Sequence, residues 1–361
     1  EIKRAVNIPV ITVGRYTEPQ FAELMVKEGR ADLVAFGRQS LADPAMPKKA
    51  QEERLEDMTP CIACLQGCVA NMYAGNPVCC LTNPFLGHEA EPLEKAEEPK
   101  KVMVIGGGVA GLSAAFIAKE RGHEVTLYEA GDVLGGNMRL AAYPPGKGDI
   151  TNMIRSYIHR CQKDGVKIVM NCEVTPELIK EEKPDSVIIA TGSKTLILPI
   201  EGIDNPAIIH GSDLLDGKRA AGKKVLVVGG GMVGCETAAF LGEQEHDVTV
   251  IEFRDTVGAD VIHEHRVYLM KDFEDYGIKE ITGAKVCKFY EDGVEYETAD
   301  GVRHESRGYD SVILSMGFRN YNPLEEKIKD LVPETHVIGD AIRARRALDA
   351  TKEAYEVASR I

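Results

Sequence analysis

Five cysteines lie close together between Cys61 and Cys80. Cys61, Cys64 and Cys68 recur with two and three residues between them, and Cys79 and Cys80 follow the segment 69–78. Iron–sulfur clusters are bound by cysteine thiolates, and three crowded ligands with one distant ligand let a short segment surround a cluster from several sides. We therefore predict that one cluster is held by Cys61, Cys64, Cys68 and Cys80.

Two other readings of these thiols stay open. A structural zinc ion prefers four tetrahedral ligands in two close pairs, which a group of three with a lone fourth matches less well. Unligated thiols are the remaining alternative. Disulfides are disfavoured because the first residues lack the charged head, apolar run and cleavage site of a signal peptide, which points to a reducing cytoplasm.

Glycine-rich loops are the second set of residues whose types and spacing predict a binding function. The apolar run Val102–Ile105 leads into Gly106-Gly107-Gly108-Val109-Ala110-Gly111, a helix over 112–121 and a strand over 124–128 that ends in Glu129. In such a unit Gly106 forms the turn, Gly108 lets a pyrophosphate approach and Gly111 allows close helix packing. Glu129 stands where an acceptor for a ribose hydroxyl is expected.

The same unit occurs a second time. Val225–Val228 leads into Gly229-Gly230-Gly231-Met232-Val233-Gly234, a helix through Leu241 and a strand over 247–251 that ends in Glu252. Two such units predict two dinucleotides. The Glu252 carboxylate favours NADH over NADPH because it repels a 2′-phosphate, an effect that Arg254 partly offsets. Strands over 187–192, 312–317 and 337–341 accompany the two units.

Two Gly-Arg pairs follow apolar runs near the N-terminus. A strand over 8–13 ends in Gly14-Arg15, a helix is expected over 17–29, and a strand over 31–36 ends in Gly37-Arg38. This pattern resembles the last two strands of a (β/α)8 barrel, where a phosphate site is commonly built. The alternative is two ordinary βα units with surface arginines. With only two of eight strands present, we expect the chain to begin inside a longer polypeptide.

The composition limits the functional classes. The chain has 361 residues, 44% hydrophobic content and a net charge of −14, and this charge argues against nucleic acid and anionic membranes as partners. No apolar run is long enough to span a bilayer. A charged, proline-containing linker covers 89–101. We expect a barrel remnant over 1–57, an iron–sulfur segment over 58–97, an FAD-binding domain over 98–220 and 321–361, and an NAD(P)H-binding domain over 221–320.

The order of these features is similar to the C-terminal part of the NADH:flavin oxidoreductase family. Its members include 2,4-dienoyl-CoA reductase, 2-enoate reductases, bile-acid-inducible flavoproteins and trimethylamine dehydrogenase. The resemblance implies an α/β chain with the end of an FMN-binding (β/α)8 barrel, followed by two Rossmann-like, glutathione-reductase-like domains. It also implies FAD, a [4Fe-4S] cluster and NADH, with FMN in the full-length protein.

Carried over to this sequence, the resemblance implies four sets of binding residues. The cluster ligands are the four cysteines above, with Cys79 as a non-ligand. The residues implied to bind the FMN phosphate are Arg15, Gly37 and Arg38. The residues implied to bind FAD are Gly106, Gly108, Ala110, Gly111, Glu129, Asn137, Lys147, Val174, Gly339 and Asp340. The residues implied to bind the nicotinamide dinucleotide are Gly229, Gly231, Gly234 and Glu252.

Three functions are consistent with this pattern. The first is the electron-input half of an NADH-dependent reductase of activated C=C bonds, with electrons passing from NADH to FAD, the cluster and FMN. The second is an amine dehydrogenase of the trimethylamine type, which the intact second glycine loop disfavours. The third is an electron-transfer subunit that docks on another chain. The substrate would be an unsaturated acid or acyl-CoA, a homo-oligomer is allowed, and no catalytic residue is assigned because the acid would lie in the absent barrel strands.

Overall fold

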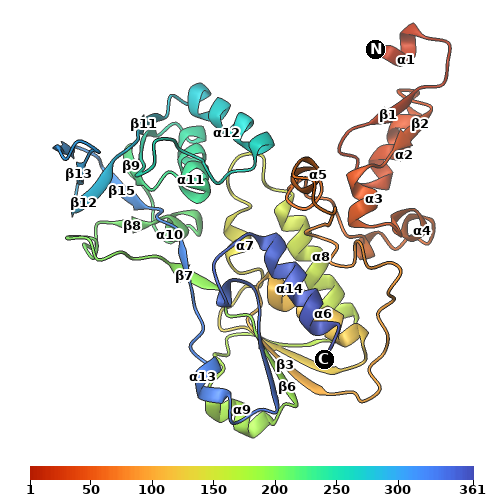
Figure 1. Cartoon of the computed structure of the whole chain (residues 1–361). Coiled ribbons are helices and arrows are strands. Elements are labelled where there is room, and N and C mark those ends of the chain that lie inside the picture. Colours follow the sequence, from red (N-terminus) through yellow and green to blue (C-terminus); the bar gives the residue numbers. More distant parts are fainter. The chain divides into compact units, whose positions relative to one another are not determined.

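The computed structural model describes all residues, 1–361, and the chain divides into two compact units (Figure 1). The first unit comprises Glu1–Arg139, Asp149–Gly192 and Tyr321–Ile361. The second comprises Leu140–Gly148 and Ser193–Asn320. Each unit contains one five-stranded sheet, so each has its own hydrophobic core.

The N-terminal part of the first unit contains a small parallel pair of strands. Its elements are α1 (Ile2–Ala5), β1 (Ile11–Val13), α2 (Pro19–Lys27), β2 (Leu33–Ala35), α3 (Arg38–Ala42), α4 (Met46–Gln51) and η1 (Leu55–Asp57). Strands β1 and β2 pair in parallel from Ile11 with Leu33 to Val13 with Ala35. Both strands are shorter than expected. They pair only with each other, and Pro9 before β1 has no N–H to extend the ladder.

The end of this N-terminal part is attached to the rest of the first unit by Asp57. The Asp57 carboxylate contacts His159 Nε2 at 2.9 Å and Lys163 on α8 (Ile150–Lys163), and it contacts Arg54 Nη1 at 2.9 Å. Burial alone would raise the pKa of Asp57, but hydrogen bonds from Lys163, His159 and Arg54 hold it well below its usual range. The attachment is therefore ionic at neutral pH.

The central sheet of the first unit is parallel throughout. Its strand order is β17 (Glu334–Val337), β6 (Ser186–Ile189), β3 (Lys101–Ile105), β4 (Glu124–Tyr128) and β5 (Lys167–Val169). One face is covered by α6 (Val109–Glu120), α8 and α14 (Ala347–Ala358), which lie side by side in Figure 1. The other face packs against α9 (Pro176–Glu182) and α13 (Glu325–Ile328) through Ile179 and Ile328. The helix α5 (Val69–Tyr73) lies within the cysteine segment.

The second unit has three layers. Its parallel sheet runs β11 (Lys279–Ile281), β10 (Asp247–Ile251), β9 (Lys224–Val228), β15 (Ser311–Leu314) and β8 (Ile209–His210). One face packs against α10 (Gly211–Leu215), α11 (Met232–Glu243) and α12 (His263–Asp275). The other face packs against an antiparallel sheet of β12 (Lys285–Tyr290), β13 (Gly293–Glu297) and β14 (Arg303–Ser306). A further antiparallel pair joins β7 (Ser193–Thr195) to β16 (Phe318–Asn320).

This architecture confirms the predicted α/β fold with two Rossmann-like sheets, with corrections at three strand ends. The strands expected over 187–192 and 312–317 end early, at Ile189 and Leu314. The strand expected over 337–341 is wrong in its second half, because β17 ends at Val337 and residues Gly339–Ala341 form the 3-10 turn η2. Gly339 has a φ of 65°, which lies outside the β region. The short helix α7 (Asn137–Leu140) was also not predicted.

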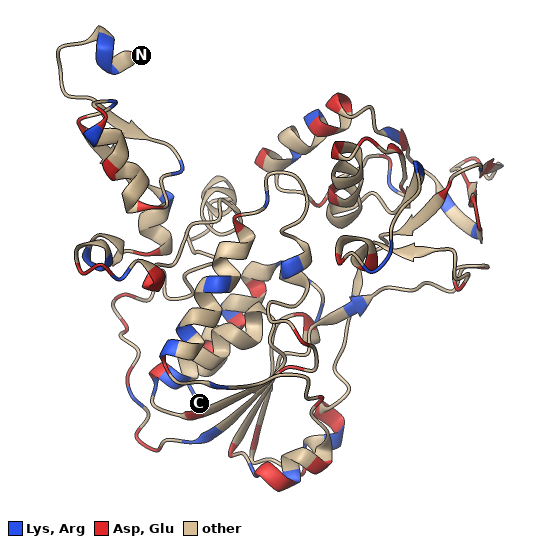
Figure 2. Cartoon of the chain, turned by 180° about the vertical axis from the view of Figure 1, so that it is seen from behind, with Lys and Arg blue, Asp and Glu red and all other residues tan.

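Charged residues of both signs are mixed along the helices. Figure 2 shows acidic and basic residues together on α12 and on α9. On α12 the Lys271 ammonium lies 2.8 Å from the Asp275 carboxylate one turn away. No helix in the structure combines the length and the apolar character that crossing a membrane requires.

Candidate functional site

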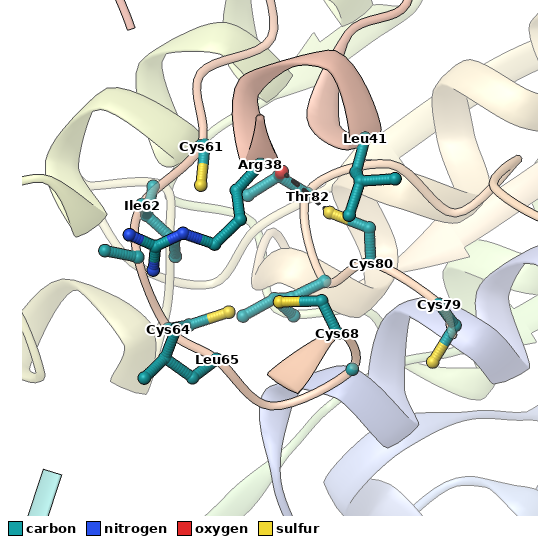
Figure 3. Close-up of a pocket in the computed structure, with 13 residues that line it drawn as sticks. Arg38, Leu41, Cys61, Ile62, Cys64, Leu65, Cys68, Cys79, Cys80 and Thr82 are labelled. Atoms are coloured by element: carbon teal, nitrogen blue, oxygen red, sulfur yellow. Dashed lines mark hydrogen bonds between the residues drawn. The ribbon is translucent and has the colours of Figure 1, made fainter. Parts of the chain in front are cut away.

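The cysteine segment folds around a cavity in the first unit. Its lining residues are Arg38, Leu41, Cys61, Ile62, Ala63, Cys64, Leu65, Gly67, Cys68, Cys79, Cys80, Leu81 and Thr82. Figure 3 shows the sulfurs of four cysteines turned toward the same space, namely Cys61, Cys64, Cys68 and Cys80. The Cys79 sulfur points away from this space and accepts a hydrogen bond from Asn71 Nδ2 at 3.3 Å. The structure therefore brings together the four predicted ligands and separates Cys79 from them.

The chemistry of the cavity suits a group larger than one ion. No three His, Cys, Asp or Glu side chains converge closely enough to hold a single metal ion. Zinc requires such convergence, with every sulfur about 2.3 Å from one centre. An iron–sulfur cluster instead spreads its four thiolates around a body of several atoms.

Burial keeps the Cys61 and Cys64 thiols protonated in the absence of a bound cation. It raises the pKa of Cys64 to about 12 and also raises the pKa of Cys61, with the neighbouring sulfurs adding to both increases. The nearby positive charge of Arg38 acts in the opposite direction on Cys61. Because a coordinated thiol loses its proton to the metal, a cationic group would reverse this state. The donor set thus fits a buried metal–sulfur group.

A second cavity in the first unit adjoins the cysteine cavity. It contains about 590 Å³ of space not filled by protein atoms and is lined by Val13, Gly14, Arg15, Tyr16, Thr17, Ala35, Gly37, Arg38, Gln39, Cys61 and Ala63. It therefore gathers both Gly-Arg pairs, which lie at the carboxyl ends of β1 and β2. Arg38, Cys61 and Ala63 line both cavities. The predicted phosphate site and the predicted cluster site share a wall.

Gln39 fixes this shared wall, and its role was not predicted. Its amide is 2% exposed, accepts a hydrogen bond from the Cys61 N–H at 2.8 Å and donates one to the Thr59 carbonyl at 2.9 Å. The start of α3 is thereby bound to the first cysteine. The only sequence signal was a polar residue directly after Gly37-Arg38 at a helix start. Arg15 differs from Arg38 in forming an ion pair with Asp149.

The first glycine loop, Gly106–Gly111, joins β3 to α6. Glu129 at the end of β4 accepts hydrogen bonds from the Gly107 N–H and the Gly131 N–H, both at 2.7 Å. A Cβ at Gly106 would collide with the Ala190 carbonyl, and one at Gly111 would collide with the Gly106 carbonyl. A Cβ at Gly108 would meet no atom within 4 Å. The position expected to face a pyrophosphate is therefore the open one.

Other predicted FAD residues lie close to this loop. Gly339 packs against Ala110, so that a Cβ at Gly339 would lie 3.0 Å from the Ala110 methyl group. Asp340 follows it and accepts a hydrogen bond from the Arg345 N–H at 3.0 Å. Gly136, next to Asn137, is also close to this loop, because a Cβ at Gly136 would lie 3.2 Å from the Gly108 Cα. The Cys172 N–H bonds the Glu129 carbonyl at 2.9 Å and places buried Val174 nearby.

Lys147 belongs to the second unit, whereas the other predicted FAD residues belong to the first. Its ammonium pairs with Glu236 on α11, a buried carboxylate that the sequence analysis did not single out. A buried acid two residues after the last glycine of a glycine loop was the signal that could have identified Glu236. The assignment of Lys147 to FAD stays a prediction.

The second glycine loop, Gly229–Gly234, repeats the geometry of the first. Glu252 accepts hydrogen bonds from the Gly230 N–H at 2.6 Å and the Arg254 N–H at 2.9 Å. A Cβ at Gly229 would collide with the Ser315 carbonyl, and one at Gly234 with the Gly229 carbonyl. One difference is the acid Asp260, whose carboxylate accepts from the Met232 N–H at 2.8 Å in the first turn of α11. No sequence pattern marks Asp260.

Comparisons with known proteins find matches for two parts of the chain. Residues 100–336 match the family described as pyridine nucleotide-disulphide oxidoreductase, and residues 1–57 match the NADH:flavin oxidoreductase / NADH oxidase family. The chain belongs to the NADH:flavin oxidoreductase family. This membership, which the sequence predicted, combines both matches in one chain.

Individual members of the NADH:flavin oxidoreductase family match along the whole chain. An NADH oxidase from Thermoanaerobacter brockii is 38% identical over 100% of this chain and 56% of its own length. A cinnamate reductase from Clostridium sporogenes is 34% identical over 100% of this chain and 54% of its own. A solved structure of 2-naphthoyl-CoA reductase has a TM-score of 0.95 and 34% identity, covering 100% of this chain and 55% of that one. The chain thus spans about half the length of the relatives it matches.

Proposed function

We propose that this chain is the electron-input half of an NADH-dependent flavin and iron–sulfur oxidoreductase that reduces an activated C=C bond. Electrons would pass from NADH to FAD, then to a [4Fe-4S] cluster and then to FMN, since a cluster carries single electrons between carriers that exchange two. The observation that carries this proposal is the wall shared by the cysteine cavity and the cavity of the two Gly-Arg pairs.

The chain's own residues would have separate tasks. The four inward-facing cysteines, Cys61, Cys64, Cys68 and Cys80, would hold the cluster as thiolates. Backbone N–H groups at Gly14 and Gly37 would approach the FMN phosphate, with Arg15 and Arg38 neutralising its charge. This arrangement would place the two groups on opposite sides of Cys61 and Ala63.

The two glutamates would each hold one ribose. The Glu129 and Glu252 carboxylates are each oriented by two backbone N–H groups, which leave further lone pairs for hydroxyl donors. Glu129 would bind the adenosine ribose of FAD and Glu252 that of NADH. A 2′-phosphate beside the Glu252 carboxylate would be repelled, which favours NADH over NADPH.

The proposed substrate class is an unsaturated acid or acyl-CoA. Two similar proteins are named for cinnamate and 2-naphthoyl-CoA, which both carry unsaturation conjugated to a carbonyl group. We assign no catalytic residue within this chain.

An anaerobic cofactor inventory of the full-length protein tests the proposal. We expect about four iron and four sulfide per chain together with one FAD and one FMN. Cys80→Ser should lose the cluster absorbance, whereas Cys79→Ser should retain it, because the Cys79 sulfur points away from the cavity. One flavin per chain, or equal iron loss in both variants, would contradict the proposal.

Rapid mixing with NADH distinguishes this function from an amine dehydrogenase. An intact second glycine loop predicts that NADH bleaches the flavin absorbance within seconds under anaerobic conditions. A flavin that stays oxidised with excess NADH but is reduced by simple amines would favour the amine dehydrogenase. Bleaching without turnover of any enoate in the full-length protein would favour an electron-transfer subunit.

A further inference from the structure

Arg38 occupies an unusual position between the two cavities of the first unit. It begins α3, is half-buried and lines both the cysteine cavity and the cavity of the Gly-Arg pairs. Figure 3 shows its guanidinium near Cys61, to one side of the four inward-facing sulfurs. The sequence predicted a phosphate contact for Arg38, and its side chain also borders the cysteine cavity.

Arg15 provides a contrast within the same cavity. It lines the cavity of the Gly-Arg pairs but not the cysteine cavity, and it forms an ion pair with Asp149. No ion pair between Arg38 and a carboxylate is found in the structure. A half-buried guanidinium keeps its charge and needs an anionic neighbour. The proposed FMN phosphate on one side and the thiolates of a bound cluster on the other would supply that negative charge.

The neighbouring residue holds Arg38 in this position. Gln39 accepts a hydrogen bond from the Cys61 N–H at 2.8 Å, so the start of α3 cannot move independently of the first predicted ligand. Its second bond, to the Thr59 carbonyl at 2.9 Å, fixes the chain that leads into Cys61. Because Gln39 is 2% exposed, these bonds are shielded from water.

We propose that Arg38 is a positioning residue that raises the reduction potential of the cluster. This proposal rests on the proposed function, since it requires a cluster in the cysteine cavity. Uptake of one electron adds one negative charge to a thiolate-bound cluster, and net charge is one of the factors that set its potential. A fixed guanidinium at close range stabilises the reduced form more than the oxidised form.

The structure thereby gives the two arginines different roles. Arg15 acts on the phosphate side alone, whereas Arg38 acts electrostatically on the cluster and borders the phosphate site as well. The positive charge of Arg38 borders both the proposed cluster and the proposed FMN phosphate. It would make the cluster easier to reduce only while the bond between Gln39 and Cys61 holds the segment Gly37–Gln39 in place.

A redox titration followed by electron paramagnetic resonance tests the role of Arg38. The anaerobic full-length protein with saturating FMN would be compared with its Arg38→Gln, Arg38→Lys and Arg15→Gln variants. We expect Arg38→Gln to shift the equilibrium between oxidised and reduced cluster at least roughly tenfold toward the oxidised form, which is about 59 mV for one electron. Arg38→Lys keeps the positive charge and should shift it less than about threefold. Arg15→Gln should weaken FMN binding while leaving the cluster equilibrium within the same limit.

A spectroscopic measurement on the unmodified protein covers the case in which Arg38→Gln loses its cluster. With arginine labelled by ¹⁵N in the guanidinium group, pulsed resonance of the reduced cluster should detect weak coupling to ¹⁵N. Absence of this coupling, or an unchanged potential in an Arg38→Gln protein with full iron content, would overturn the role of Arg38. Absence of iron and sulfide in the unmodified protein would instead overturn the proposed function.

Discussion

The two glycine loops have nearly the same backbone but differ at the start of the following helix. In both, a glutamate at the end of the second strand holds a glycine N–H, at 2.7 Å for Glu129 and 2.6 Å for Glu252. A Cβ at Gly108 would meet nothing within 4 Å, whereas one at Gly231 would lie 3.5 Å from the Asp260 carboxylate. The first loop therefore presents an open site for an anion, whereas the second loop presents a site that already borders the carboxylate of Asp260.

Closing either loop with a methyl group should have the largest effect. Gly111→Ala and Gly234→Ala each place a Cβ against a backbone carbonyl, which overpacks the loop and should destabilise its unit by about 1–3 kcal/mol. Gly111→Ala should lose bound FAD, and Gly234→Ala should keep FAD but lose reduction by NADH. Flavin content, stopped-flow reduction and urea unfolding measure these effects.

Gly148→Ala is a control for the glycine substitutions. Nothing lies within 4 Å of a Cβ at Gly148, and no left-handed backbone is required there. This variant should resemble the unmodified protein in stability. If Gly111→Ala and Gly234→Ala both lost FAD and kept the same response to NADH, the assignment of one dinucleotide to each loop would be wrong.

Removing the negative charge from one glutamate should separate the two loops further. Glu252→Gln keeps an acceptor for the Gly230 N–H but weakens charge-assisted bonds to ribose hydroxyls, each worth about 1.5–3 kcal/mol. The KM for NADH should therefore rise roughly 10- to 100-fold, with a smaller change for NADPH. Steady-state kinetics with both nucleotides measure the ratio. Glu129→Gln should lower FAD occupancy without changing that ratio, and a changed ratio would argue against the separate roles.

Two buried thiols behind the loops should make stability fall at alkaline pH. Cys161 donates to the Leu112 carbonyl after the first loop, and Cys235 donates to the Gly230 carbonyl in the second. Burial raises the pKa of each to about 12. Below about pH 8.5 both folded and unfolded thiols are protonated; above it only the unfolded thiol ionises, so stability falls by about 1.4 kcal/mol per pH unit for each thiol.

Alanine variants at the two thiols measure this alkaline effect in each unit. Cys161→Ala and Cys235→Ala should each reduce the loss of unfolding free energy between pH 8.5 and 10 by about 2 kcal/mol. The slope against pH is compared, because the cavity left by each substitution shifts the absolute stability at every pH. Equal slopes for a variant and the unmodified protein would mean that the thiol already ionises in the folded state.

The sequence predicted those parts of both units that local patterns determine. The strands over 124–128 and 247–251 have the predicted bounds, because each is a run of buried residues that ends at the glutamate. The inward orientation of Cys61, Cys64, Cys68 and Cys80 agrees with their spacing. The strand expected through Gly339 was wrong because the positive φ of that glycine turns the chain.

Features that depend on contacts between distant segments could not be predicted. The position of the start of α3 against Cys61 involves the bond between Gln39 and Cys61, residues that have no periodic relation. The place of Asp260 follows from a turn in which Gly258 has a φ of 63°. Residue type and spacing determine neither of these two contacts. The conformation of the loop decides, for example, which helix end the Asp260 carboxylate reaches.

The smallest expected effect concerns the acid that distinguishes the second loop. The Asp260 carboxylate bonds the Met232 N–H at 2.8 Å, in the helix turn where the proposed function requires a pyrophosphate to bind. Its negative charge stabilises the helix start but repels an incoming anion. Asp260→Asn keeps a hydrogen-bond acceptor and removes the charge. The Kd for NADH should fall about two- to fivefold, in line with a charge effect of about 0.3–1 kcal/mol at a helix end.

Salt and a matched variant separate a charge effect from a structural one. The gain in affinity for Asp260→Asn should shrink at high ionic strength, because added salt screens the repulsion in the unmodified protein. Asp255→Asn removes a negative charge from the same connection, which runs between β10 and α12, without altering the bond to Met232, and should change the Kd less. A weaker affinity for NADH in Asp260→Asn would mean that the carboxylate organises the binding site, and the two loops would then differ in how they are assembled rather than in how strongly they attract an anion.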